Sequence, residues 1–204
     1  DLEALQPVLD GRQPLIVYVD RASDIRQALK FAREQKIRIV LDGAAEGWRV
    51  ADEIAAAGVP VIVYPLEDLP NDFERIGATM DNAGMLAKAG VTVIIKSAEG
   101  GAHRVRETRY DAGNAVAHGM PYEDALKAVT LNPAKVFGVA DRMGSLEVGK
   151  DANLVVWTGD PFEPLSQPVV VIIEGREQPM TSRQEKLRAR YQDLNQAYPP
   201  AYRY

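Results

Sequence analysis

Short apolar runs alternate with amphipathic stretches over the first half of the chain. Four runs, at residues 14–19, 37–41, 60–64 and 91–95, are apolar at all positions but Arg38 and Thr92, as in strands that are buried on both faces. The stretches between them show helical spacing, most clearly in the stripe of Ile25, Ala28, Leu29 and Ala32. Strands that alternate with helices predict a parallel βα architecture with right-handed crossovers.

Local signals predict where the helices begin and end. Ser23 is of a type that caps a helix N-terminus. Gly58 and Gly90 follow apolar-periodic segments, as glycines do after a helix C-terminus. We therefore expect helices after Ser23, over residues 46–57 and over residues 81–89, with a further helix over residues 105–117.

The pattern changes after Gly119. Pro121 and the Asn132-Pro133 pair each suit the first turn of a helix. A turn-rich stretch, residues 144–153, then leads to two apolar runs at 154–157 and 169–173, which we expect to form a small separate sheet. Residues 182–197 are charged and helix-like. We therefore divide the chain into a βα part (1–140), a small-sheet segment (141–180) and a C-terminal helix and tail (181–204).

Composition excludes several classes of protein. Hydrophobic residues make up 46% and charged residues 26% of the 204 residues, the balance of a globular protein. A formal net charge of −5 disfavours a dedicated nucleic-acid binder. No apolar run approaches the length of a membrane span. The chain has no Cys, and its two His leave few nitrogen ligands for a metal. We expect a soluble protein of the cytoplasm or periplasm.

Several segments after residue 118 follow one another in a specific order and spacing. These are Gly119-Met-Pro-Tyr-Glu-Asp-Ala-Leu126, Thr130-Leu-Asn-Pro-Ala134, Gly144-Ser-Leu-Glu-Val-Gly-Lys-Asp-Ala-Asn-Leu-Val-Val156 and Ile173-Glu-Gly-Arg176. In this order they resemble the C-terminal part of the metal-dependent amidohydrolase superfamily, in particular its imidazolonepropionase-like and prolidase-like branch. Arg21-Ala-Ser-Asp-Ile25 is similar to an element of the same branch. Asn153 departs from the acidic residue that is usual at its position.

The resemblance implies a (β/α)8 TIM-type barrel with a small β-sandwich built from both chain termini, and with its sites at the carboxyl ends of the strands. Because four barrel strands are visible, we interpret them as the second half of such a barrel. Half a barrel leaves two open sheet edges and an uncovered inner face. We therefore expect a partner that supplies the N-terminal half, in the same chain or a separate one, with a homo-oligomer as the alternative.

The resemblance also implies C–N bond hydrolysis by water activated on a divalent, zinc-class metal. Its typical ligands are a His-x-His pair on the first strand, one His after each of the fifth and sixth strands, and an Asp after the eighth. Here the corresponding segments read Val17-Tyr-Val-Asp20, Val40-Leu-Asp-Gly43 and Ile95-Lys-Ser-Ala-Glu99. We assign no metal ligand within this chain. Asp20, Asp42 and Glu99 could supply carboxylate ligands at the strand ends, but we favour ordinary loop acids or helix caps. Any ligands are expected upstream, the alternative being that no metal binds.

Polar residues at the strand ends are the candidate site. We assign catalytic roles to Lys96, Glu99 and His103, which end or follow the last barrel strand, and substrate binding to five residues near the other strand ends: Tyr18, Asp20, Arg21, Asp42 and Tyr64. His103, Arg104, Arg106 and Arg109 form a basic cluster. This cluster either holds a substrate carboxylate or is a solvated helix face, and we favour the latter.

Two functions remain open from the sequence. The first is an amidohydrolase-type hydrolase that acts on a small cyclic amide or a dipeptide-like substrate. The second is a non-catalytic, degenerate amidohydrolase-like module that serves assembly or small-ligand binding, which the missing histidines favour.

Overall fold

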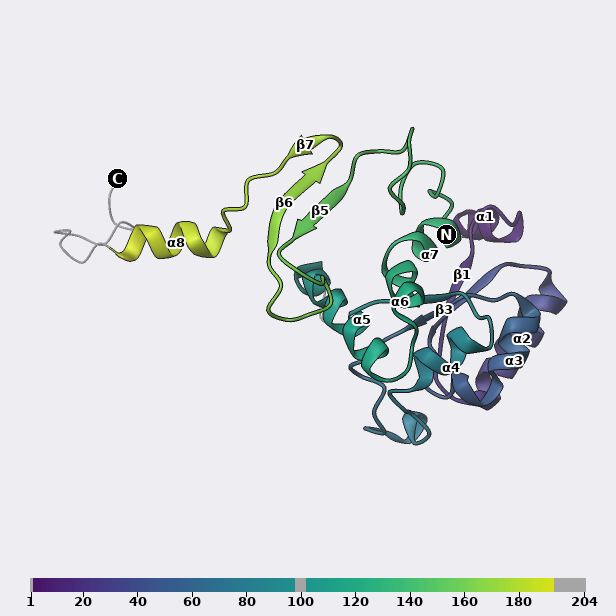
Figure 1. Cartoon of the computed structure of the whole chain (residues 1–204). Coiled ribbons are helices and arrows are strands. Elements are labelled where there is room, and N and C mark those ends of the chain that lie inside the picture. Colours follow the sequence, from purple (N-terminus) through teal and green to yellow (C-terminus); the bar gives the residue numbers. More distant parts are fainter. Residues whose placement is uncertain (1, 98–101, 193–204) are drawn as a thin grey trace.

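The chain folds around a four-stranded parallel sheet in a computed structural model that describes residues 2–97 and 102–192 (Figure 1). The strand order is β1-β2-β3-β4, so each strand pairs with its neighbour in sequence. The strands are β1 (Leu15–Val19), β2 (Ile39–Gly43), β3 (Val61–Val63) and β4 (Val93–Ile95). The four predicted βα strands and their parallel arrangement are confirmed.

Helices connect the strands in the order that the apolar periodicity predicts. The chain starts with η1 (Leu2–Leu5) and α1 (Gln6–Leu9), which the sequence pattern did not indicate. The connections then contain α2 (Ala22–Gln35), η2 (Gly47–Val50) with α3 (Ala51–Ala57), and η3 (Phe73–Arg75) with α4 (Asn82–Lys88). After β4 come η4 (Ala102–Glu107), α5 (Thr108–Ala117), α6 (Tyr122–Val129) and α7 (Leu131–Val136).

The two glycine signals for helix C-termini are confirmed, whereas the prediction that Ser23 caps the N-terminus of α2 is wrong. Gly58 and Gly90 have left-handed φ angles of 63° and 87° directly after α3 and after the end of α4. Ser23 lies inside the first turn of α2, and its hydroxyl donates to Asp24. The Ala22 N–H, at the first residue of α2, donates instead to the Glu46 carboxylate at 3.0 Å. The cap thus comes from a different connection, which local sequence rules do not anticipate.

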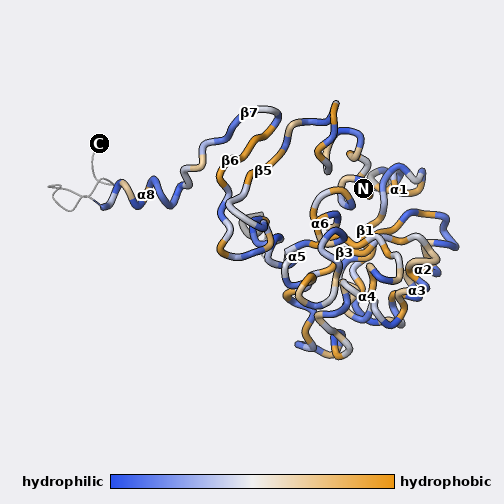
Figure 2. Tube along the Cα trace, viewed as in Figure 1, coloured by the Kyte–Doolittle hydropathy of each residue, from blue (hydrophilic) through white to orange (hydrophobic). Residues whose placement is uncertain are grey.

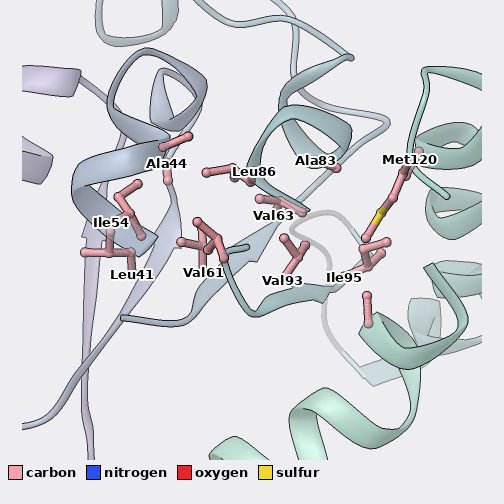
Figure 3. Packing of buried hydrophobic residues seen from close by; sticks show 14 of the residues in the cluster. Leu41, Ala44, Ile54, Val61, Val63, Ala83, Leu86, Val93, Ile95 and Met120 are labelled. Atoms are coloured by element: carbon pink, nitrogen blue, oxygen red, sulfur yellow. The ribbon is translucent and has the colours of Figure 1, made fainter. Parts of the chain in front are cut away.

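Strand residues alternate between a helix-covered face and an inner face. Leu41, Val61 and Val63 point to the helix side and are fully buried against residues such as Ile54 and Leu86 (Figure 3). The main core therefore lies between the sheet and its helices, as βα units require.

The inner face of the sheet has a smaller apolar layer. Val40, Ile62 and Ile94 form a cluster there with Val136 of α7. On the edge strand β1, the alternate positions Ile16 and Tyr18 are 49% and 58% exposed. The inner face is thus covered at one level by α7 and open to solvent along β1.

A three-stranded antiparallel sheet packs against α5. It contains β5 (Leu154–Trp157), β6 (Pro168–Ile173) and β7 (Arg176–Glu177), which agrees with the predicted small sheet. Arg109 of α5 donates to the carbonyls of Pro161 and Glu163 at 2.9 and 3.1 Å, and its guanidinium lies over the Trp157 ring. Our interpretation of Arg109 as part of a solvated helix face was therefore wrong. This residue fastens the small sheet to the βα part.

The last described helix, α8 (Arg183–Gln192), projects away from the two sheets and is mostly hydrophilic (Figure 2). Its N-terminus has a reciprocal capping box. The Glu185 carboxylate accepts from Ser182 N–H, and the Ser182 hydroxyl accepts from Glu185 N–H. None of the helices in the described part of the chain combines the length and apolar character that crossing a bilayer requires. The division at residues 140 and 180 stays a prediction.

The helix-side core gives a stability prediction. Leu41→Ala removes a fully buried side chain between β2 and its helices. We expect the free energy of unfolding to fall by about 2–5 kcal/mol, measured by denaturant titration, because a cavity remains where the side chain was. Val148→Ala, at a fully exposed apolar position, is the matched control and should change it by less than about 0.5 kcal/mol.

Candidate functional site

Polar side chains gather on the inner face where the four strands end. Tyr18 pairs in register with Asp42 on β2, and Tyr64 and Lys96 directly follow β3 and β4. The alternation that points Val40, Ile62 and Ile94 inward also points these four residues inward, one level closer to the carboxyl ends of the strands. An apolar layer thus carries a polar layer at the rim where a βα barrel places its site.

Three residues of this rim form one hydrogen-bonded row. The Tyr64 hydroxyl donates to Asp42 Oδ1 at 2.6 Å and accepts from Lys96 Nζ at 3.1 Å. The ammonium also lies 5.3 Å from the centre of the Tyr64 ring, a cation–π contact. Tyr64 is 5% exposed, whereas Lys96 is exposed. The structure therefore brings together three predicted site residues as a cation, a hydroxyl and a carboxylate.

A second network surrounds Asp20, directly after β1. Its Oδ2 accepts from the Tyr18 hydroxyl at 2.8 Å and from Arg75 Nε at 3.2 Å, and its Oδ1 accepts from the Ala45 N–H at 3.2 Å. Asp20 and Arg75 are both buried. Tyr18 and Asp20 therefore belong to one network, in which the buried carboxylate orients the more exposed hydroxyl.

Arg21 lies beside this network but binds in a different direction. Its Nη2 donates to the Phe73 carbonyl at 2.9 Å and its Nε pairs with the Glu74 carboxylate at 2.9 Å. Both partners belong to residues 65–81, the segment between β3 and α4, which we call the strap. Arg21 thus holds the strap and makes no described contact with the rim row.

Two predicted catalytic residues lie at the edge of what the structure describes. Glu99 falls in residues 98–101, outside the described residues. The backbone of His103 belongs to η4, while its side chain lies outside the described part. Their assignment stays a prediction.

The strap contributes buried polar residues that sequence reasoning missed. Asp68 is 1% exposed, and its Oδ2 accepts from the Asn82 amide of α4 at 3.2 Å. The same amide donates to the Ala44 carbonyl at 3.0 Å, and its oxygen accepts from Trp48 N–H at 2.9 Å. Burial raises the pKa of Asp68 from its usual value near 3.8 to about 7, although the Asn82 amide and the Arg75 charge oppose this rise.

One signal in the sequence could have pointed to these residues. Residues 65–81 form a long connection without helical or strand periodicity, and such connections in compact domains are often functional. The start of the strap is held by α5. The Asn114 amide donates to the Pro65 carbonyl, and buried Asp111 accepts from Leu66 N–H. Burial also raises the pKa of Asp111, to about 6.

The described residues do not fit the zinc-type site that the resemblance implies. Among residues 2–97 and 102–192, no three His, Cys, Asp or Glu side chains are grouped so that they could hold a metal ion. At the end of β1 stands Tyr18, which is bound to Asp20. At the end of β2 stands Gly43, with φ 95°, where a Cβ would lie 2.7 Å from Asp20 Oδ1 and 3.2 Å from the Tyr18 ring. Asp42 is already bound by Tyr64.

The arrangement offers hydrogen bonding and electrostatics. Lys96 provides an exposed cationic donor, and Asp42, two hydrogen bonds away, provides a charged acceptor. A cis amide, as in a small lactam ring, presents a carbonyl oxygen and an N–H on the same side and matches this donor and acceptor; a trans peptide bond presents only one of the two to the row. The rim can therefore hold an amide and stabilise negative charge that develops on its oxygen.

Comparisons with known proteins agree with this architecture. The model of the Amidohydrolase family matches residues 45–181. The imidazolonepropionase of Erwinia tasmaniensis is 26% identical over 71% of this chain and 42% of its own length. The amidohydrolase tasK of Hapsidospora irregularis is 40% identical over 33% of this chain and 7% of its own length. The chain thus spans less than half the length of these curated relatives.

Solved structures show the same relation. An amidohydrolase from Thermotoga maritima MSB8 superposes with a TM-score of 0.80 at 34% identity, over 86% of this chain and 46% of that one. A prolidase complexed with N-methylphosphonate-L-proline, at 16% identity and a TM-score of 0.63, shares the fold. The four βα units are therefore the second half of a TIM-type barrel, and the small sheet is its accessory domain. Because the family model covers more than half of it, the chain belongs to the amidohydrolase family.

Proposed function

We propose that this chain is the substrate-holding half of a hydrolase that cleaves C–N bonds in a cyclic amide or dipeptide-like substrate. The observation that carries the proposal is the row of Asp42, Tyr64 and Lys96 at the rim of the half-barrel. Family membership supports the reaction class, and the donor–acceptor row supports an amide as the group that is held.

Each rim residue has a role in this proposal. Lys96 Nζ donates to the amide oxygen and stabilises the negative charge that grows there as water attacks. In a cyclic amide, whose carbonyl oxygen and N–H lie on the same side, Asp42 accepts from the amide N–H. Tyr64, fixed between them, keeps the two groups at a constant separation, so that they are organised before substrate arrives.

The second network, around Asp20, contributes a further contact. The Tyr18 hydroxyl, held by buried Asp20, faces the same side as the row and can reach the rest of the substrate. In our proposal Arg21 acts through the strap that it binds. Glu99 and His103 are proposed to complete the rim after β4.

The remaining parts of the active site are proposed to come from the N-terminal half of the barrel, in the same or a separate chain. A zinc-class ion supplies activated water in proteins of this type. Its ligands would belong to that other half, because the strand ends described in this chain are occupied by Tyr18, Gly43 and bound carboxylates. The open inner face along β1 is the surface that such a half would cover.

A second candidate function is a non-catalytic module for assembly or small-ligand binding. The packing at Gly43, at the end of β2, favours this function. A metal-binding side chain has no room at this position, because its Cβ would collide with Asp20. Metal analysis of the intact protein separates the two functions. Zinc-class ions lost together with amidase activity on chelation support the hydrolase, and a metal-free protein without activity supports the module.

The Lys96 role gives a kinetic prediction. With the barrel completed, Lys96→Met should lower kcat/KM on a responsive lactam or dipeptide by about 10²-fold, because one charged donor to the developing oxyanion is lost. Lys96→Arg should retain part of this activity. Steady-state kinetics measure both.

Lys88→Met, on the exposed face of α4, is the matched control for loss of a lysine charge. Equal activity of Lys96→Met and Lys88→Met would contradict the assignment of Lys96.

The half-barrel gives a prediction about assembly. We expect size-exclusion chromatography with light scattering to show the isolated chain as an oligomer or aggregate, because an open sheet edge and an apolar inner face favour pairing. Addition of the N-terminal half should give a defined complex. A stable monomer with native-like near-UV circular dichroism would refute this dependence.

A further inference from the structure

A buried charge cluster ties the strap to the end of β1. Arg75, in η3 of the strap, is 7% exposed and donates through Nε to Asp20 Oδ2. Its Nη1 donates to the Glu67 carbonyl at 3.4 Å, within the strap itself. The same Asp20 oxygen accepts from the Tyr18 hydroxyl. One guanidinium thus contacts both the strap backbone and the carboxylate that orients a rim side chain.

Asp68 is the second acid of this cluster and is only partly satisfied. Its Oδ2 is bound by Asn82, while its Oδ1, buried from solvent, has no hydrogen-bond partner among the described residues. A buried carboxylate oxygen without a donor disfavours the ionised form. The missing donor is the geometric reason why the pKa of Asp68 lies well above its ordinary value.

The charges around Asp68 are few and can be named. Arg75 and Glu67 face it from the strap, and Asp20 faces it from the end of β1. From α4 it meets the neutral amide of Asn82. With Asp68 protonated, Arg75 and Asp20 form a neutral buried pair. With Asp68 ionised, two buried acids compete for one guanidinium, and Glu67 adds further repulsion.

We propose that Arg75 is a positioning residue, which holds the Tyr18 hydroxyl through Asp20 and ties the strap to the rim, and that the proton on Asp68 sets how firmly this tie holds. Ionisation of Asp68 draws Arg75 away from Asp20. The Tyr18 hydroxyl then loses its fixed acceptor geometry, and the strap loosens at its centre.

The strap is built so that loosening at its centre changes the surface at the rim. Its two ends are held independently, by Asn114 at Pro65 and by the Trp48 indole at the Gly77 carbonyl. At that second end, the side chains of Glu46 and Arg49 lie against Gly77. Between the ends it carries four exposed apolar side chains: Leu66, Leu69, Phe73 and Ile76. The position of its centre therefore sets where this apolar surface lies relative to the end of β1, to which Asp20 and Arg21 hold it.

The sign of the pH dependence follows from linkage. The pKa of Asp68 is near 3.8 in the unfolded chain and about 7 in the folded one, so between these values the folded state binds the extra proton. The stabilising contribution of this proton is complete below about pH 4 and is lost as the pH rises to about 7. Strap protection and the Tyr18 environment should change at the upper end of this window.

The test uses the full chain and three readouts that do not require activity. Hydrogen exchange of residues 65–81 reports the tie. The ring resonance of Tyr18, assigned by its absence in Tyr18→Phe, reports the hydroxyl. The thermal midpoint reports linkage. In the wild type we expect the protection factors of the strap, which compare each exchange rate with the intrinsic rate at the same pH, to fall as the pH passes 7. We also expect a shifted Tyr18 resonance above pH 7, and a midpoint that falls from pH 4 to 7.

Asp68→Asn keeps the shape and removes the titration, so it should abolish the change in strap protection and in the Tyr18 resonance near pH 7. It should reduce, without abolishing, the fall of the thermal midpoint from pH 4 to 7, because Asp111 also has a raised pKa and contributes to that fall. Arg75→Lys should give low protection factors for the strap and a shifted Tyr18 resonance at every pH. We choose lysine because Arg75→Met would leave Asp20 buried without a cation, and such a variant is at risk of misfolding.

Asp111→Asn is the matched control, since Asp111 is also a buried acid with a raised pKa that holds the strap near its start. The proposal is overturned if Asp68→Asn retains the wild-type pH dependence, or if Asp111→Asn alone removes it. The contact of Tyr18 with substrate rests on the proposed function. If the three readouts behave as expected but Tyr18→Phe leaves KM unchanged, the positioning stands and the substrate role fails.

Discussion

The Asp20 carboxylate is the point at which the rim of this half-barrel is fixed. It is 5% exposed and receives hydrogen bonds from Tyr18, from the N–H of Ala45 after β2 and from Arg75 of the strap. Three segments are thereby joined at one buried charge, which is tolerated because each donor compensates for lost hydration. The same carboxylate fills the space beside Gly43. The rim therefore has its present shape because Asp20 is buried and fully engaged.

This constraint explains how a member of the amidohydrolase family can carry a polar rim without the usual ligand set in this half. The strand ends are occupied by internally paired groups: Tyr18 with Asp20, and Asp42 with Tyr64 and Lys96. A lysine ammonium, a hydroxyl and a carboxylate can bind and polarise an amide by charge and hydrogen bonds. Below them, the inner face is apolar. Val40, Ile62 and Ile94 form a buried cluster there, on which the row lies.

Two expectations failed for the same reason, which is that a group far away in the sequence supplied the partner. Ser23 was expected to cap α2, but Glu46 binds the Ala22 N–H. Arg109 was interpreted as solvated, but it binds carbonyls of the loop beside the small sheet. Propensity rules describe what a side chain does with its own neighbours, and both of these contacts are tertiary.

The sequence by itself determined the order of strands and helices and the placement of Tyr18, Asp42, Tyr64 and Lys96 at strand ends. These features depend on local periodicity and on the carboxyl ends of parallel strands meeting at one edge. Only the tertiary structure decided which polar groups pair. Arg75 and Asp20 are 55 residues apart in the chain, and their contact exists because the strap folds back over the end of β1, where burial makes an unpaired charge costly.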